Sequence, residues 1–334
     1  MSARINPVSK RSQQNKHNPT QTKKPREQAV EPARATVGDW IEGARLRTLP
    51  LALVPVLLGT ASAIAQAPGE YHWVRALAAL AVALLLQIGV NFANDYSDGI
   101  RGTDDFRVGP PRLTGSGNVE PKLVRNVAFA CFGAAAVVGL WLCATTGQWW
   151  LAAVGVVSIL AAWYYTGGKR PYGYAGLGEL FVFVFFGLVA TAGTTYVQIL
   201  RVNEDTWILA IAAGLFACAV LMINNIRDIE QDELAGKRTL AVMIGPVAAR
   251  IVFAVMVFLP FIATFMFALV FPRTLFALFS LFVLVPAVII GVTGQTAKEQ
   301  VLALKLTSLG SLAWAVFMTA GVIFPIVEIA PRPY

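Results

Sequence analysis

Residues 73–98 read WVRALAALAVALLLQIGVNFANDYSD, an apolar run that ends in amides and carboxylates. Only Arg75 and Gln87 interrupt the run before Asn91. The segment 73–95 exceeds the ~20 residues that an α-helix needs to cross a bilayer. This stretch therefore predicts a membrane-spanning helix whose last turns present polar side chains.

The whole chain has the composition of an integral membrane protein. Of its 334 residues, 56% are hydrophobic and only 14% are charged, which is too apolar for an ordinary soluble domain. Apolar segments recur along the chain, separated by short polar connections. The sequence predicts an all-α, polytopic membrane protein with cytoplasmic cap loops and nine transmembrane helices at 45–66, 73–95, 122–146, 149–166, 178–200, 206–227, 247–271, 274–294 and 301–327.

The positive charges are distributed unevenly along this pattern. Residues 1–38 are basic, polar and nearly free of apolar side chains, which predicts a disordered cytoplasmic tail before a transmembrane domain at 39–330. The tail lacks the apolar core of a secretory signal, and it is either simply solvated or paired with anionic lipid headgroups. With the N-terminus inside, 23 of the 27 Lys and Arg residues fall on the cytoplasmic side. We therefore expect a multi-pass protein of the cell membrane with a cytoplasmic N-terminus.

Several kinds of chemistry are excluded by residue type. Cys131, Cys143 and Cys218 are odd in number and lie inside apolar stretches, which argues against disulfides and a cysteine metal site. Only two histidines exist, His17 in the tail and His72 in a short connection, so a histidine base or zinc site is not expected. Catalysis must therefore depend on carboxylates, amides, Lys, Arg or Tyr. No nucleic-acid partner is expected.

The first of two Asn/Asp-rich clusters lies at the end of the segment 73–95. On a helix, Asn91, Asp95 and Asp98 stand at i, i+4 and i+7 and share one face. Carboxylates one turn apart repel each other by about 4 kcal/mol at the effective dielectric of a protein surface. A divalent cation would remove much of that cost, so these three residues are candidate metal ligands.

The second cluster ends the segment 206–227 in a similar way. Asn224, Asp228 and Asp232 recur at i, i+4 and i+8, which predicts that they share a helix face. The two clusters stand four predicted helices apart, a spacing that suggests two related halves running in the same direction. We therefore expect the clusters to oppose each other at the cytoplasmic side of the membrane, where plain solvated loops are the alternative explanation.

Two facing carboxylate clusters suit one type of ligand. Mg²⁺ is commonly bound by one or two carboxylates together with substrate phosphates. Basic side chains near such a site would stabilise the charge that develops on a leaving phosphate. The candidates near the clusters are Arg101, Arg107, Arg112, Lys169, Arg170, Lys237 and Arg238.

Other features support two interpretations each. The segment 109–117, with Asp104 and Asp105 before it, is a flexible cover over the site or a plain connector. Tyr164 and Tyr165 are interfacial aromatic residues or π-faces for a carbocation. Glu179 begins a helix or acts as a base.

The clusters and their neighbours together resemble the UbiA superfamily of intramembrane aromatic prenyltransferases, from Trp40 onward. Within it, the chain is similar to the branch that prenylates 1,4-dihydroxy-2-naphthoate in menaquinone synthesis. In the hydroxybenzoate branch, a further Asp stands where this chain has Gly99. The similarity lies in Asn94-Asp95-Tyr96-x-Asp98-Gly99, Gly109-Pro-x-Arg112, the stretch from Tyr165 through Pro171 to Glu179, and Asn224-Asn225-x-Arg227-Asp228.

The resemblance implies Mg²⁺-dependent transfer of a polyprenyl group from its diphosphate to the naphthoate, with loss of CO₂, to give demethylmenaquinone. The prenyl tail would lie among apolar helix faces, next to the lipid bilayer. The implied catalytic and metal-binding residues are Asn91, Asp95, Asp98, Asp228 and Asp232. The implied substrate-binding residues are Arg101, Arg112, Tyr164, Lys169, Arg170, Asn224, Asn225 and Lys237.

Three other functions compete with this prediction. One is prenyl transfer to another acceptor, such as homogentisate, a chlorophyllide or haem. A CDP-alcohol phosphotransferase also places Asp clusters on membrane helices, but its Asp-Gly-x-x-Ala-Arg core is absent after Asp98-Gly99. A cation transporter is expected to place acids near the midplane of the bilayer rather than at one surface. The donor chain length and the oligomeric state are not fixed by the sequence.

Overall fold

The computed structural model describes residues 35–103, 112–117 and 119–329, with side chains through Phe324. The predictions for residues 1–34 and for Asp104, Asp105, Arg107 and Gly109 therefore lie outside the described residues. The first helix begins at Val37, within the last residues of the predicted tail. The described residues contain no β-strand, so the predicted all-α class is confirmed for them.

The first half of the chain forms five α-helices. An N-terminal capping box between Thr36 and Asp39 starts the first of them, and Arg45 ends it in the left-handed conformation with φ 54°. The long third helix carries the first Asn/Asp-rich cluster at its C-terminal end. The elements are α1 (Val37–Ala44), η1 (Leu46–Thr48), α2 (Pro50–Gln66), α3 (Trp73–Ile100), α4 (Pro121–Thr146) and α5 (Trp150–Tyr164).

The second half contains more interruptions. A seven-residue π-helix joins two α-helices into one rod, and non-helical Gly245 followed by Pro246 bends a later helix. The elements are η2 (Tyr172–Tyr174), α6 (Gly178–Val182), η3 (Phe183–Val189), α7 (Ala190–Ile199), α8 (Glu204–Arg227), α9 (Ile229–Leu234), α10 (Leu240–Phe258), α11 (Phe261–Ala268), η4 (Pro272–Ser280), α12 (Leu281–Thr293) and α13 (Ala297–Ile329).

Each of the nine predicted apolar segments overlaps helices of the described residues. Seven helices are long and apolar enough to cross a bilayer, or eight if the bent pair of 37–48 and 50–66 forms one span. The helix α5, with 15 residues, is shorter than the ~20 that a crossing needs. The multi-pass architecture is therefore confirmed, while the count of nine crossings stays a prediction.

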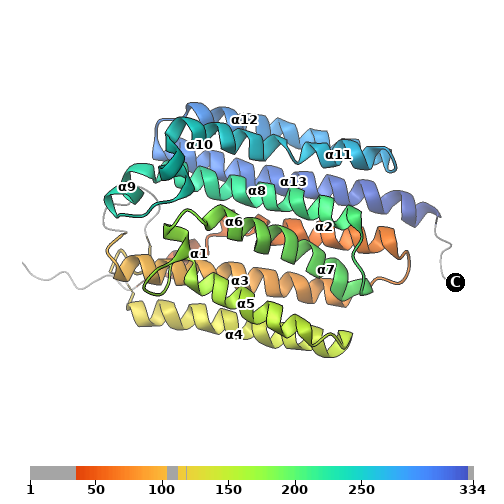
Figure 1. The fold of residues 1–334 in the computed structure, drawn as a ribbon, viewed down its shortest axis with the longest axis horizontal. Coiled ribbons are helices and arrows are strands. Elements are labelled where there is room, and N and C mark those ends of the chain that lie inside the picture. The colour runs from red at the N-terminus through yellow and green to blue at the C-terminus, as the bar shows by residue number, and fades with distance from the viewer. Residues whose placement is uncertain (1–34, 104–111, 118, 330–334) are drawn as a thin grey trace, which may run out of the picture. The chain divides into compact units, whose positions relative to one another are not determined.

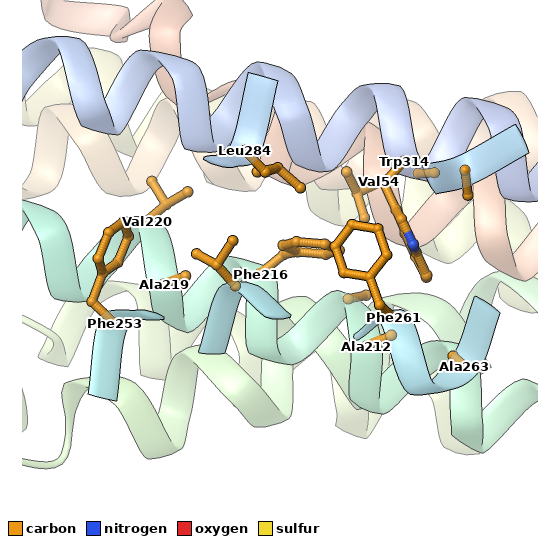
Figure 2. Close-up of a cluster of buried hydrophobic side chains, with 14 of the residues drawn as sticks. Val54, Ala212, Phe216, Ala219, Val220, Phe253, Phe261, Ala263, Leu284 and Trp314 are labelled. Carbon is orange, nitrogen blue, oxygen red and sulfur yellow. The ribbon is translucent and has the colours of Figure 1, made fainter. Parts of the chain in front are cut away.

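The principal hydrophobic core lies between α2, α8 and the helices from α10 to α13 (Figure 2). Phe216 and Trp314 are fully buried there, with ring centroids 5.2 Å apart. The indole N–H of Trp314 donates to the Thr264 hydroxyl at 2.9 Å, which satisfies its one polar atom inside the core. Burying this much apolar surface fixes α8, and α8 carries the second Asn/Asp-rich cluster at its C-terminal end.

A close backbone contact fixes the π-helix η3 against α8. A Cβ added to Gly187 would lie 2.5 Å from the Cα of Gly214, so only glycine permits this approach. The C-terminal ends of α3 and α8, the start of α6 and the short helix α9 all lie at one end of the bundle (Figure 1). The fold thus brings the two predicted clusters to the same end of the helices.

Candidate active site

A cavity of about 330 Å³ lies between α2, α3, α5, the rod from α6 to α7, and α8. Most of its wall is apolar, contributed by Leu, Val, Ala and Phe side chains along these helices. Its polar side chains include several at the bundle end where the two clusters lie, namely Asn91, Asn94, Asp98, Arg112, Tyr165, Thr166, Asn224, Asn225 and Lys237. The cavity can therefore accept a long apolar molecule with a charged group at one end.

Three side chains on one face of α3 line the polar end of the cavity. The amide of Asn91 donates to the Ala44 carbonyl at 3.0 Å, which ties α3 to the end of α1. The Thr166 hydroxyl donates to the Oδ1 of Asn94 at 2.7 Å, which ties α3 to the segment after α5. Asp98 is the third member and is 5% exposed. The set that faces the cavity is thus Asn91, Asn94 and Asp98.

Asp95 does not belong to this set, although its spacing predicted that it would. Its Oδ2 accepts the backbone N–H of Leu113 at 3.0 Å, and its Oδ1 accepts that of Thr114 at 2.9 Å. Asp95 follows Asn94 and therefore points to a different side of α3. Its carboxylate faces Leu113 and Thr114, and Asp95 is not among the residues that line the cavity. The predicted shared face of Asn91, Asp95 and Asp98 is therefore corrected at Asp95.

Asp98 is held by two donors from distant parts of the chain. The Nη1 of Arg112 donates to its Oδ2 at 2.7 Å, in an ion pair whose side chains are both less than one-tenth exposed. The Tyr174 hydroxyl donates to its Oδ1 at 2.8 Å. The guanidinium of Arg101 and the ammonium of Lys237 stand 5.5 and 5.4 Å from the centre of the Tyr174 ring. Tyr174 thus contacts one acid of the site, Asp98, and two cations, Arg101 and Lys237.

The second cluster is interrupted at Asp228, where the sequence predicted one continuous helix face. Helix α8 ends at Arg227, and the N–H of Asp228 bonds to the Asn225 carbonyl, three residues back, at 3.1 Å. The Nε of Arg227 donates to the Oδ1 of Asp228 at 2.7 Å, so the carboxylate pairs with its own neighbour. Helix α9 then begins at Ile229 and carries Asp232 in a new direction. Asn224 still lines the cavity from α8.

The two clusters interact electrostatically at the polar end. Burial raises the pKa of the Asp232 carboxyl, and the nearby carboxylates of Asp228 and Asp98 raise it further. The Lys237 ammonium opposes that rise, since it lies 3.3 Å from the Oδ1 of Asp232. Tyr174 links the two acids, since its hydroxyl bonds to Asp98 and its ring lies 5.4 Å from the Lys237 ammonium that pairs with Asp232. That this end of the bundle is cytoplasmic stays a prediction.

A further acid, Glu179, lies beside the cavity at the start of α6. The amide of Asn225 donates to its Oε1 at 3.0 Å, while its buried Oε2 has no hydrogen-bond partner among the described residues. The Tyr165 ring lies at the same point, since a Cβ added to Gly178 would stand 3.4 Å from its hydroxyl oxygen.

Four predicted substrate-binding residues lie outside the cavity lining. Tyr164, Lys169 and Arg170 are exposed to solvent or lipid. Arg101, the fourth, donates from its guanidinium to the carbonyls of Thr166 and Gly168. The prediction that Lys169 and Arg170 contact the ligand therefore has no support in the described geometry.

The donor set fits a divalent cation that arrives together with phosphate oxygens. Among the described residues, no three carboxylate, His or Cys side chains are arranged to hold a metal by themselves. The buried Oδ2 of Asp232, however, has no hydrogen-bond partner in the same part of the chain. One or two carboxylates plus substrate phosphates is the usual Mg²⁺ coordination, so Asp232 and Asp98 are suitable ligands.

Sequence reasoning missed two residues of this site. Asn94 stands four residues before Asp98, so a helical wheel could have placed it on the cavity face. Tyr174 lies in a Gly-rich connection, and nothing in its local pattern predicts contact with Asp98, 76 residues away in the chain.

Residues 52–309 match the sequence profile of the UbiA prenyltransferase family. The chain is 44% identical over 290 residues to a Mycobacterium tuberculosis protein named 1,4-dihydroxy-2-naphthoate octaprenyltransferase, covering 87% of this chain and 98% of that protein. A Mycobacterium leprae protein of the same name is 50% identical over 216 residues, covering 65% of this chain and 72% of its own length.

The fold is also similar to that of solved structures. A UbiA homolog from Archaeoglobus fulgidus, solved with GPP and Mg²⁺ bound, superposes with a TM-score of 0.55 at 16% identity. The superposition covers 84% of this chain and 99% of that one. At this level of identity, the likeness establishes a shared helical fold.

Proposed function

The chain belongs to the UbiA prenyltransferase family, and we propose that it transfers a polyprenyl group from polyprenyl diphosphate to 1,4-dihydroxy-2-naphthoate. The C1–O bond of the donor breaks, and C1 bonds to the ring carbon that carries the carboxylate. CO₂ leaves from that carbon, and its bonding electron pair restores the aromatic ring. The products are diphosphate, CO₂ and the prenylated quinol, whose two-electron oxidised form is demethylmenaquinone.

The observation that carries this proposal is the near-complete coverage of a relative with this named activity, at 44% identity over 98% of its length. The shape of the cavity agrees with it, since an apolar wall leads to a charged end. A prenyl diphosphate has the same division between an apolar tail and a charged head.

The residues of the polar end would take distinct roles. Asp98 and Asp232, with Asn94 and Asn225 beside them, would hold Mg²⁺ and the diphosphate. Bound Mg²⁺ supplies a Lewis acid that offsets the negative charge building on the leaving diphosphate. Arg112 and the other cations of this end contribute fixed positive charge to the same group.

Two tyrosines that line the cavity would contact the prenyl group of the donor. The rings of Tyr165 and Tyr172 line the cavity next to the polar side chains, with centroids 5.5 Å apart. An aromatic face attracts a cation by about 0.5–2 kcal/mol, more when water is excluded. Tyr165 would therefore stabilise positive charge on C1, which is one of the two roles that the sequence suggests for Tyr164 and Tyr165.

We further propose nine crossings of the cell membrane with the polar end on the cytoplasmic side. The eight candidate spans, counting the bent pair, leave α5 as the ninth. The excess of Lys and Arg at this end supports the orientation. Cysteine labelling at the α4–α5 turn and at the α9–α10 turn would test it, because the proposal places these turns on opposite sides.

The deciding experiment incubates the purified protein with 1,4-dihydroxy-2-naphthoate, octaprenyl diphosphate and Mg²⁺. We expect a prenylated naphthoquinol by mass spectrometry and one CO₂ released per product when the carboxylate is isotopically labelled. Homogentisate and 4-hydroxybenzoate serve as matched acceptors in parallel. Product with either of these acceptors and none with the naphthoate would overturn the proposed acceptor while leaving the family intact.

A further inference from the structure

Asp95 is buried beside the site, and both oxygens of its carboxylate accept hydrogen bonds from the backbone of the segment 112–117. It is 2% exposed, and its two oxygens accept the N–H groups of Leu113 and Thr114 at 3.0 and 2.9 Å. Hydrogen bonds to an ionised carboxylate are about twice as strong as neutral ones. A carboxylate that accepts two such bonds is an anchor for the segment 112–117.

The packing around the anchor shows how closely this segment lies on α3. A Cβ added to Gly99 would lie 2.4 Å from the Cγ2 and 2.6 Å from the Cβ of Thr114. Leu113 is 3% exposed and belongs to the same buried cluster as Phe92 of α3. Segment 112–117 can therefore hold its position only with glycine at position 99 and a double acceptor at position 95.

The residue directly before the two anchored amides is Arg112. Its Nη1 donates to Asp98 at 2.7 Å and to the Asn94 carbonyl at 3.2 Å, and its side chain lines the cavity. Because positions 113 and 114 are fixed on α3, the backbone of Arg112 is fixed as well. The guanidinium then reaches Asp98 at the polar end of the cavity.

Resting on the proposed function, we propose that Asp95 is a positioning residue that holds Arg112 at the diphosphate end of the cavity, and that it is not a metal ligand. Asp95 and Asp98 thus have different roles in the first cluster. Asp98 faces the ligand, and Asp95 fixes the segment that delivers the cation. Position 95 carries a carboxylate because two backbone N–H donors each need an acceptor oxygen there.

The test is a double-mutant cycle between Asp95→Asn and Arg112→Gln. An asparagine keeps the size of the side chain but turns an NH₂ group towards one of the two N–H donors, so one hydrogen bond is lost. We expect each single variant to raise the KM for octaprenyl diphosphate about tenfold, the scale of one lost hydrogen bond to a charged group. In the Arg112→Gln background, Asp95→Asn should add about twofold or less, because its effect acts through Arg112.

Two measurements keep this test separate from catalysis. Hydrogen exchange of the peptide containing Leu113 and Thr114 should quicken in Asp95→Asn but not in Asp232→Asn. Mn²⁺ binding at saturating diphosphate, followed by electron paramagnetic resonance, should weaken in Asp232→Asn and stay within about twofold in Asp95→Asn, because the diphosphate site is then filled in both variants. Since neither readout needs turnover, a failure of the proposed function would leave both results interpretable.

Gly99→Ala offers a second route to the same displacement, through steric contact with Thr114 and without a change in charge. We expect it to raise the same KM and to quicken the same exchange, even if Asp95→Asn folds poorly. Additive losses in the cycle, or Mn²⁺ binding weakened in Asp95→Asn as much as in Asp232→Asn, would overturn the positioning role and favour a metal ligand.

Discussion

Replacing Tyr174 with Phe removes one hydroxyl from the centre of the site and leaves the ring in place. That hydroxyl donates to the Oδ1 of Asp98 at 2.8 Å, and Asp98 is 5% exposed. A hydrogen bond to a charged group contributes about 1.5–3 kcal/mol. Since Arg112 still holds the other oxygen of Asp98, we take the lower end, about 1.5 kcal/mol, which corresponds to about tenfold in rate.

The assay compares kcat/KM for octaprenyl diphosphate in the wild type, Tyr174→Phe and Tyr174→Leu. The Phe variant should lose about tenfold, because the carboxylate that faces the diphosphate loses one of its two orienting donors. The Leu variant also removes the ring that Arg101 and Lys237 approach, at about 0.5–1 kcal/mol for each such contact. It should therefore lose about fivefold or more beyond the Phe variant.

Thermal unfolding in detergent distinguishes a variant that has lost the orientation of Asp98 from one that has lost its fold. Tyr174→Phe should unfold within a few degrees of the wild type, since its ring packing is unchanged. The reasoning is refuted if Tyr174→Phe keeps kcat/KM within about twofold of the wild type while it remains folded. It is also refuted if the Leu and Phe variants are equally active, because the ring would then have no share in placing the cations.

Two further substitutions test other parts of the structure. Lys169→Ala and Arg170→Ala should each keep kcat/KM within about threefold, because both side chains are exposed and outside the cavity lining; a tenfold rise in the KM for the naphthoate would contradict this placement. Gly187→Ala should lower the free energy of unfolding by about 1–3 kcal/mol, because its Cβ would meet the Gly214 backbone at 2.5 Å. Gly133→Ala is the matched control, since nothing lies within 4 Å of a Cβ there, and equal stability of the two variants would disprove the close contact.

The helical scaffold could be predicted because apolar length is a property of each segment by itself. The run at 73–95 is long enough to span a bilayer whatever its neighbours do. The interruptions are harder to predict. Pro246 indicates a bend after Gly245, but the π-helix at 183–189 has no proline, and it lies where Gly187 approaches Gly214 on another helix. Local sequence does not contain that contact.

The site was predictable down to its clusters, but not down to the direction of each side chain. Helical spacing placed Asp95 and Asp98 near one another, and 100° per residue leaves them about 60° apart on the wheel. Which of them faces the cavity is decided by Leu113 and Thr114, whose N–H groups attract the carboxylate of Asp95. The break at Asp228 is different, because it coincides with a local pairing of the Asp228 carboxylate with Arg227 at the end of α8.

The charge pattern of the site also has a consequence for the order of binding. Each of the three central carboxylates already has a cationic partner: Asp98 pairs with Arg112, Asp228 with Arg227 and Asp232 with Lys237. Mg²⁺ alone would either lie close to the Lys237 ammonium at the open Oδ2 of Asp232 or displace one of these cations into a poorly solvated end of the bundle, and both are costly. Mg²⁺ together with a diphosphate offers an exchange, because the displaced guanidinium or ammonium can turn to the phosphate oxygens. Under the proposed function, metal and prenyl donor should therefore bind cooperatively, each strengthening the affinity of the other by the same factor.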